Sequence, residues 1–247
     1  MILITGASSG IGEACALLLA EKKIPLILIA RRSDRLSLTH KKCQELGSKV
    51  YSFNLDVTKT ADIINWAQKN CDLLSKCEVL INNAGLAVGL KTFDQVESHE
   101  WDQMIDVNIK GVMLFSSLLL PHFIKKDSGH IINLGSVAGH HVYPRGNVYC
   151  ATKHAVHAFS QSLRADLLGK NIRVSEISPG MVETEFSEVR LQDKDKAKKV
   201  YQGLKPLSAH DIAEVIAWCL DRPKHVNIEE IILYPTMQAS PTLIHRL

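Results

Sequence analysis

The sequence predicts a doubly wound α/β fold, in which helices cover both faces of a parallel sheet. Seven short apolar runs alternate with longer segments whose apolar residues recur at helical spacing. Continuous apolar runs are typical of strands buried on both faces, and repeated strand–helix alternation favours parallel pairing through right-handed crossovers. A glycine-rich turn also stands at the first junction between such a run and a helical segment.

The pattern predicts seven strands and six helical segments. The strands are Ile2–Thr5, Pro25–Ala30, Val50–Leu55, Val79–Ile81, His130–Leu134, Ile172–Ile177 and Ile231–Leu233. The helical segments are Gly12–Lys23, Asp34–Leu46, Thr60–Ser75, Trp101–Lys125, Tyr149–Gly169 and Ala209–Leu220. No repeat or low-complexity linker interrupts them, so we expect one domain over residues 1–247. The irregular stretch over about 180–206 is long for a connection, and we predict a loop over the active site.

Composition and charge exclude several classes of protein. The net charge of +3 is spread without blocks of like charge, so we expect no nucleic-acid partner. No apolar run approaches the length that spans a membrane, and no signal sequence precedes the first predicted strand. We therefore expect no membrane partner and a cytoplasmic location.

The cysteines and histidines give no metal-binding spacing. Six cysteines are scattered without a C-x-x-C pair, and the eleven histidines form no pattern typical of zinc sites. The cysteines are interpreted as reduced thiols, and the sequence predicts no metal.

The glycine-rich turn predicts a nucleotide site. Gly6, Gly10 and Gly12 follow the first strand with the spacing G-x-x-x-G-x-G. Glycine permits a tight turn and a close approach of the backbone to a pyrophosphate, and the helix that follows offers unpaired N–H groups. A plain tight turn is the alternative, which the position at the first junction disfavours.

The end of the second strand predicts the choice of cofactor. Arg31 and Arg32 stand where related architectures that use NAD place an acid for the ribose 2′-hydroxyl. A guanidinium binds a 2′-phosphate through paired, charge-assisted hydrogen bonds, so the pair indicates NADP(H). At the third strand's end, Asp56 has two open interpretations, a turn residue or a partner for adenine. Asn82–Gly85, at the fourth strand's end, is expected to have at least a structural role.

Two residues on one predicted helix form a candidate acid/base pair. Tyr149 and Lys153 are four residues apart and therefore share a helix face. A nearby ammonium favours the phenolate, so we expect Lys153 to lower the pKa of Tyr149. An ordinary helix-surface pair is the alternative. Ser136, at the end of a strand, is expected to hydrogen-bond a substrate carbonyl oxygen.

Asn108 is a polar residue within an otherwise apolar helical segment. Three interpretations stay open: it is exposed, it bonds its own backbone and bends the helix, or it holds a water that relays a proton to Lys153.

These motifs together resemble the short-chain dehydrogenase/reductase family over the whole chain. The resemblance implies a Rossmann-type fold with a seven-stranded parallel sheet flanked by helices, and a homotetramer. It implies that Tyr149 is the general acid/base, that Lys153 binds the nicotinamide ribose, that Ser136 orients the carbonyl, and that Asn108 organises the proton relay. The cofactor-binding residues that it implies, with those argued above, are Gly6, Ser8, Ser9, Gly10, Ile11, Gly12, Arg31, Arg32, Asp56, Val57, Asn83, Ala84, Gly85, Tyr149, Lys153, Pro179, Gly180, Val182 and Thr184.

Four segments are similar to the NADP-dependent 3-hydroxy acid dehydrogenases, which oxidise serine and allo-threonine. They are Asn83–Ala87, Gly146–Tyr149, Thr184–Arg190 and His225–Ile228. A hydroxy acid needs a cation for its carboxylate, and Arg190 and Arg145 are the candidates, beside Ser136 and Tyr149 as substrate-binding residues. The alternatives are a broad carbonyl or diketone reductase and a non-catalytic sensor of NADP(H).

Overall fold

A seven-stranded parallel sheet organises the structure, a computed structural model that describes residues 1–247. Its strands are β1 (Ile2–Thr5), β2 (Leu26–Ala30), β3 (Val50–Asn54), β4 (Val79–Asn82), β5 (Gly129–Leu134), β6 (Ile172–Pro179) and β9 (Glu230–Leu233). The order is β3-β2-β1-β4-β5-β6-β9, and every pairing is parallel. The predicted fold is confirmed, and the order of the strands reverses between β1 and β4, which is the point where ligands bind in open α/β sheets.

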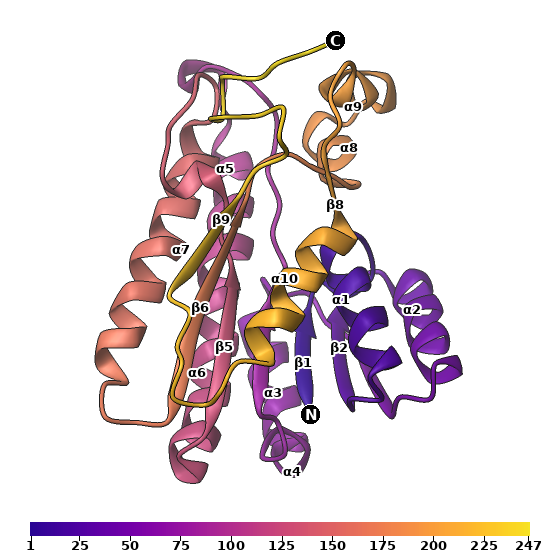
Figure 1. Ribbon diagram of the computed structural model, residues 1–247, viewed down its shortest axis with the longest axis vertical. Helices are drawn as coiled ribbons and strands as arrows, with labels where there is room; N and C mark the ends of the chain where they lie inside the picture. Colours follow the sequence, from indigo (N-terminus) through magenta and orange to yellow (C-terminus); the bar gives the residue numbers. More distant parts are fainter.

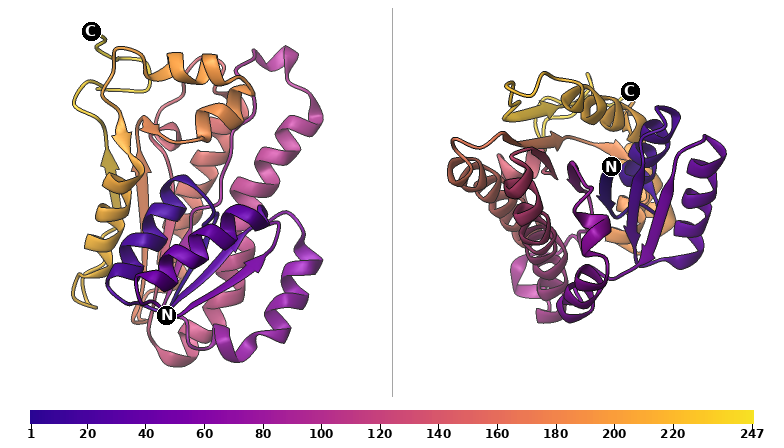
Figure 2. Two further views of the ribbon diagram at one scale, coloured as in Figure 1. Left: turned by 90° about the vertical axis from the view of Figure 1, so that its right-hand side faces the viewer. Right: turned by 90° about the horizontal axis from the view of Figure 1, so that it is seen from below.

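Helices cover both faces of the sheet (Figures 1 and 2). On one face lie α1 (Gly10–Glu21), α2 (Ser33–Glu45) and α10 (Ala209–Leu220). On the other lie α3 (Thr60–Lys69), α4 (Cys71–Leu74), α6 (Gly111–Lys126) and α7 (Asn147–Asp166). The connections between these elements contain two short 3₁₀ turns, η1 (Phe93–Gln95) and η3 (Val137–Gly139).

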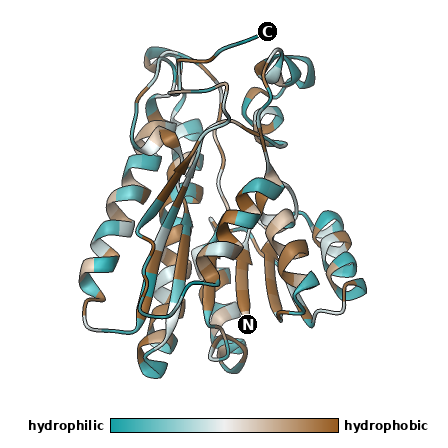
Figure 3. Ribbon diagram, in the orientation of Figure 1, coloured by the Kyte–Doolittle hydropathy of each residue, from teal (hydrophilic) through white to brown (hydrophobic).

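The two faces explain the solid apolar runs in the sequence. Successive residues of a strand point to opposite faces, so Ile2 and Ile4 join one core cluster while Leu3 joins the other. Each is at most 4% exposed. The central strands β1 and β2 are therefore almost entirely hydrophobic, whereas the helices turn hydrophilic residues outward (Figure 3).

The predicted helix over Trp101–Lys125 is divided. It consists of α5 (Ser98–Ile105), a π-helical turn η2 (Asp106–Lys110) and α6. By length and composition the run Ser98–Lys126 is apolar enough to span a membrane. Its residues Phe115 and Phe123 are instead completely buried against the sheet, as in the core helix of a globular protein.

The stretch over 180–206 is more regular than predicted. It contains β7 (Val182–Glu183), α8 (Phe186–Leu191) and α9 (Lys194–Tyr201), and β7 pairs with β8 (Leu207–Ser208). Asp193 caps α9 by accepting hydrogen bonds from the backbone N–H groups of residues 195 and 196, both at 3.0 Å. Both helices lie beyond the carboxyl end of the sheet, at the top of Figure 1.

Candidate active site

A cavity of about 540 Å³ opens at the carboxyl ends of the strands. It extends from the turn after β1, past the ends of β4 and β5, to α7 and α8. The volume lies in the range of small-molecule and cofactor sites. Almost all the residues predicted to bind cofactor or substrate line it, and the exceptions are Gly12 and Arg145. Asn108, predicted to organise a proton relay, does not line the cavity either.

The glycine-rich turn has the backbone that only glycine adopts easily. Gly6 and Gly10 have φ of +67° and +55°, in the left-handed region. Gly12 serves packing: a Cβ there would lie 2.4 Å from the Gly6 carbonyl oxygen and from Asn83 Nδ2. The turn therefore delivers the N-terminus of α1 to the cavity, with the geometry that a pyrophosphate requires.

The two predicted arginines stand at the rim of the cavity in different environments. Arg32 forms an ion pair with Glu185, at 2.9 Å between Nη1 and Oε2, and also hydrogen-bonds the Ser9 hydroxyl. Arg35 pairs with the same carboxylate, and Arg35 and Arg32 together lower the pKa of Glu185. Arg31 is exposed and forms no ion pair, so its guanidinium is available to a ligand.

Asp56 and Asn83 both serve as structural residues. Asp56 Oδ1 accepts two hydrogen bonds at 2.9 Å, from the backbone N–H and the hydroxyl of Thr58, which is a local turn. Asn83 Nδ2 donates to the carbonyls of Thr5 and Gly6, at 2.9 and 3.2 Å. Asn83 thus ties the end of β4 to the glycine-rich turn, and both residues also border the cavity.

Ser136, Tyr149 and Lys153 come together at the floor of the cavity. Ser136 follows β5, where its Oγ accepts a hydrogen bond from the Ala138 N–H at 3.1 Å. Tyr149 and Lys153 lie one turn apart on α7, and both are less than 10% exposed. Lys153 Nζ donates to the Leu134 carbonyl at 2.7 Å and lies 6.0 Å from the centre of the Tyr149 ring.

Burial sets the acid–base properties of this group. Desolvation raises the pKa of Tyr149 above its ordinary value, while hydrogen bonding with Ser136 and the charge of Arg190 lower it less. The lowering of this pKa by Lys153 stays a prediction, since burial dominates and the Lys153 ammonium donates to the Leu134 carbonyl. Desolvation also lowers the pKa of Lys153 to about 8.

Of the two arginines predicted for a substrate carboxylate, the structure brings only Arg190 to the site. Its Nε donates to the Gly89 carbonyl and its Nη1 to the Tyr143 hydroxyl, both at 3.0 Å. Its Cζ lies 5.5 Å from the centre of the Tyr149 ring, and Nη2 has no protein partner. Arg145 lies outside the cavity, on an exposed loop with φ of +64°, because the chain turns away there before α7.

Comparison with known proteins identifies the family of this chain. The family model for short chain dehydrogenases matches residues 1–195. The chain belongs to the short chain dehydrogenase family. As a member of this family it is an oxidoreductase.

Similar proteins cover this short chain dehydrogenase from end to end. The NADP-dependent 3-hydroxy acid dehydrogenase of Salmonella typhi is 40% identical over 249 residues, covering 100% of this chain and 99% of that protein. The protein of the same description from Schizosaccharomyces pombe is 40% identical over 251 residues, covering 99% and 96%. A structure of the closed form of serine dehydrogenase complexed with NADP+ superposes with a TM-score of 0.89, at 38% identity, covering 100% and 99%.

Asn108 lies behind the cavity of this short chain dehydrogenase and is 1% exposed. Its Oδ1 accepts from the Leu86 N–H at 2.9 Å, and its Nδ2 donates to the Leu86 carbonyl and the Thr152 hydroxyl, at 2.8 and 3.0 Å. It is therefore neither exposed nor bonded to its own backbone. These bonds fix the loop after β4 against α7, and the proton relay stays a prediction.

Several lining residues of the short chain dehydrogenase site were not predicted as site residues, although Glu185 and Phe186 lie in the segment Thr184–Arg190. Tyr143 positions Arg190, Phe186 packs 5.6 Å from Tyr149 between ring centres, and Glu185 holds Arg32. Gln238 reaches the cavity from near the C-terminus and accepts from the Met181 N–H at 2.8 Å. A lone polar or aromatic residue in a loop gives no spacing signal, so only the folded chain identifies these.

Proposed function

We propose that this short chain dehydrogenase transfers hydride between NADP(H) and a small 3-hydroxy acid, such as serine or allo-threonine. The observation that carries the proposal is the place of Arg190. Its guanidinium faces the Tyr149 ring inside the cavity and keeps Nη2 free, so a substrate carboxylate can pair with it while the hydroxyl-bearing carbon lies near the phenol.

The cofactor is NADP(H). The glycine-rich turn and the N-terminus of α1 fit a pyrophosphate, and Arg31 with Arg32 fits a 2′-phosphate. Proteins similar to this chain are described as NADP-dependent, and one is described in complex with NADP+. When bound, the cofactor supplies the hydride or accepts it.

The chain's own residues handle the substrate oxygen and its proton. In oxidation, Tyr149 takes the proton of the substrate hydroxyl, and in reduction it returns that proton to the oxygen. Ser136 Oγ hydrogen-bonds the same oxygen and stabilises its negative charge. Lys153 holds positive charge beside the phenol and binds the ribose. Asn108 is a positioning residue, because its bonds to Leu86 and Thr152 place the walls of the site.

A panel of matched substrates tests the proposal. With NADP+ at alkaline pH, we compare 3-hydroxybutyrate with its uncharged amide. We also compare serine with 2-amino-1,3-propanediol, in which a hydroxymethyl group replaces the carboxylate. We expect kcat/KM at least about tenfold higher for each acid, which is the contribution of one charge-assisted contact. Equal or better turnover of the neutral compounds would indicate the broad carbonyl reductase instead. Stoichiometric NADPH binding with no turnover would indicate the sensor.

We also propose a homotetramer and a cytoplasmic location for this enzyme, which its resemblance to the family supports. Light scattering of the purified chain should give four times the monomer mass, and a monomer or a dimer would contradict the first proposal.

A further inference from the structure

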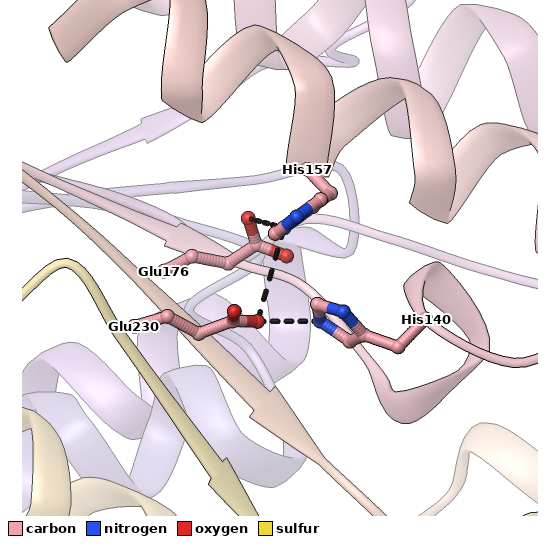
Figure 4. Close-up of side chains that lie close together, drawn as sticks. All are labelled: His140, His157, Glu176 and Glu230. Atoms are coloured by element: carbon pink, nitrogen blue, oxygen red, sulfur yellow. Dashed lines mark hydrogen bonds and ion pairs between the residues drawn. The ribbon is translucent and has the colours of Figure 1, made fainter.

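Four side chains from four separate parts of the chain meet outside the active-site cavity (Figure 4). His140 follows η3, His157 lies on α7, Glu176 on β6 and Glu230 on β9. Each offers one ligand atom, and these atoms lie within 4.8 Å of one another. None of the four lines the active-site cavity. We refer to them as the His–Glu cluster.

The cluster places two carboxylates side by side in a shielded position. Glu176 and Glu230 are direct register partners on neighbouring parallel strands, so their side chains project from the same face of the sheet. The Glu176 side chain is 1% exposed and that of Glu230 is 18% exposed. Two like charges at such a position are unfavourable unless a positive charge lies between them.

Two buried atoms of the cluster lack a hydrogen-bond partner. His140 Nε2 and Glu230 Oε1 lie 2.5 Å apart and are shielded from solvent, yet neither makes a hydrogen bond with acceptable geometry. Buried polar atoms are rarely unpaired, and an ion is one of the explanations when they are.

The distances and the donors suit a transition metal. Ligand atoms about 2.0 Å from a tetrahedral ion are separated by roughly 3.3 Å. His157 Nδ1 lies 3.1 Å from Glu176 Oε2 and 3.8 Å from Glu230 Oε1, which bracket that value. The pair at 2.5 Å would open by roughly 0.8 Å to reach the tetrahedral separation, and the remaining pairs lie within 4.8 Å. Two imidazoles with two carboxylates are a donor set that zinc and its neighbours accept.

Outer partners of two ligands are also in place. The Ser178 hydroxyl donates to Glu176 Oε1 at 3.1 Å, which fixes that carboxylate. Gln161 contacts His157 Nε2 at 3.1 Å, on the side of the ring opposite Nδ1. The atom in contact is the amide nitrogen, Nε2. Exchange of the amide oxygen and nitrogen by a half-turn of the group would let the oxygen accept a hydrogen bond from a protonated His157 Nε2 and leave Nδ1 free for a metal.

We propose that the His–Glu cluster binds one divalent transition-metal ion per chain, in a structural site. Four protein ligands close the coordination shell, as in structural sites, and leave no position for substrate. The ion would join the turn that follows Ser136, the helix that carries Tyr149 and Lys153, and the edge of the sheet. Its function would be to hold the wall of the active site together.

Zinc binding to the full-length chain tests this proposal. The protein is treated with a chelator, dialysed and titrated with ZnCl₂ by calorimetry. We expect one Zn²⁺ per chain, and at a hundredfold excess over Kd a rise of about 5–10 °C in the thermal midpoint. Co²⁺ should give a tetrahedral visible spectrum without a thiolate charge-transfer band, because the ligands are nitrogen and oxygen.

Matched variants locate the ion. His157→Gln should weaken zinc binding at least tenfold, whereas His154→Gln, on the exposed face of the same helix, should leave it unchanged. Gln161→Leu keeps all four ligands and should weaken binding about tenfold, since it removes an outer partner. Absence of stoichiometric binding, or equal binding by wild type and the His157 variant, would overturn the proposal. Circular dichroism shows whether each variant is folded. If the His157 variant does not fold, zinc binding by the Gln161 variant tests the proposal instead.

Discussion

Replacement of Arg190 by alanine should abolish the enzyme's preference for substrates that carry a carboxylate. The guanidinium has one free amino group, Nη2, directed at the space beside the Tyr149 ring. A hydrogen bond to a charged partner contributes about 1.5–3 kcal/mol, which corresponds to roughly 10- to 150-fold in kcat/KM. We expect Arg190→Ala to lose this factor on 3-hydroxybutyrate and much less on its amide. Steady-state kinetics with NADP+ measures both substrates side by side.

The amide also controls for damage to the loop. Arg190 bonds the Gly89 carbonyl and the Tyr143 hydroxyl, so its removal loosens α8 for every substrate. Only the ratio between acid and amide reports on the carboxylate contact. Arg145→Ala is the matched control, because it removes an arginine outside the cavity and should leave the ratio unchanged. Equal losses on acid and amide would refute the carboxylate contact and assign Arg190 a purely structural role.

Three further variants test the rest of the site. Tyr149→Phe should keep NADPH binding, measured by fluorescence, and lower kcat by about 10²–10⁴; near-normal turnover would contradict the acid/base role. Arg31→Asp should shift the preference from NADPH toward NADH by about 10- to 100-fold, measured as the ratio of kcat/KM values, because Arg31 has no competing ion pair. Burial holds the pKa of Lys153 at about 8 against the ordinary 10.5, so the unfolded chain binds this proton more tightly between those values. Lys153→Met should therefore raise the free energy of unfolding below pH 8, by roughly 3 kcal/mol, and this gain should shrink as the pH rises toward 10.5; a gain independent of pH would contradict burial of a charged amine.

The sheet could be predicted closely because its signal is local. The central strands are buried on both faces, so a run such as Leu26–Ala30 is uniformly apolar and its limits are visible in the sequence. The glycine-rich turn could also be predicted, since positive φ at Gly6 restricts the residue type. The π-helical turn could not, because it depends on bonds between Asn108 and Leu86, which are 22 positions apart in the chain.

The site was predictable only where its residues lie in motifs. Tyr149 and Lys153 share a helix face, so their spacing revealed their proximity. The burial that raises the pKa of Tyr149 could not be predicted from that spacing, because it depends on how α7 packs in the folded chain. The His–Glu cluster gave no spacing signal at all, since its members come from four elements and meet only through the register of β6 and β9.

The π-helical turn lets the two halves of one continuous helical run direct their apolar faces toward different parts of the core. Before it, Met104 packs in the small cluster around Tyr149; after it, Phe115 and Phe123 pack in the large cluster under the sheet. A π turn accommodates one residue more than an α turn, so it rotates everything that follows by about 100° relative to a regular helix. A regular α-helix over the same residues would therefore turn one of these two apolar faces toward water. Deletion of one residue within Asp106–Lys110 should remove the π turn and leave both faces in place, whereas a further insertion should displace one of them, so an enzyme engineered here tolerates a shorter segment better than a longer one.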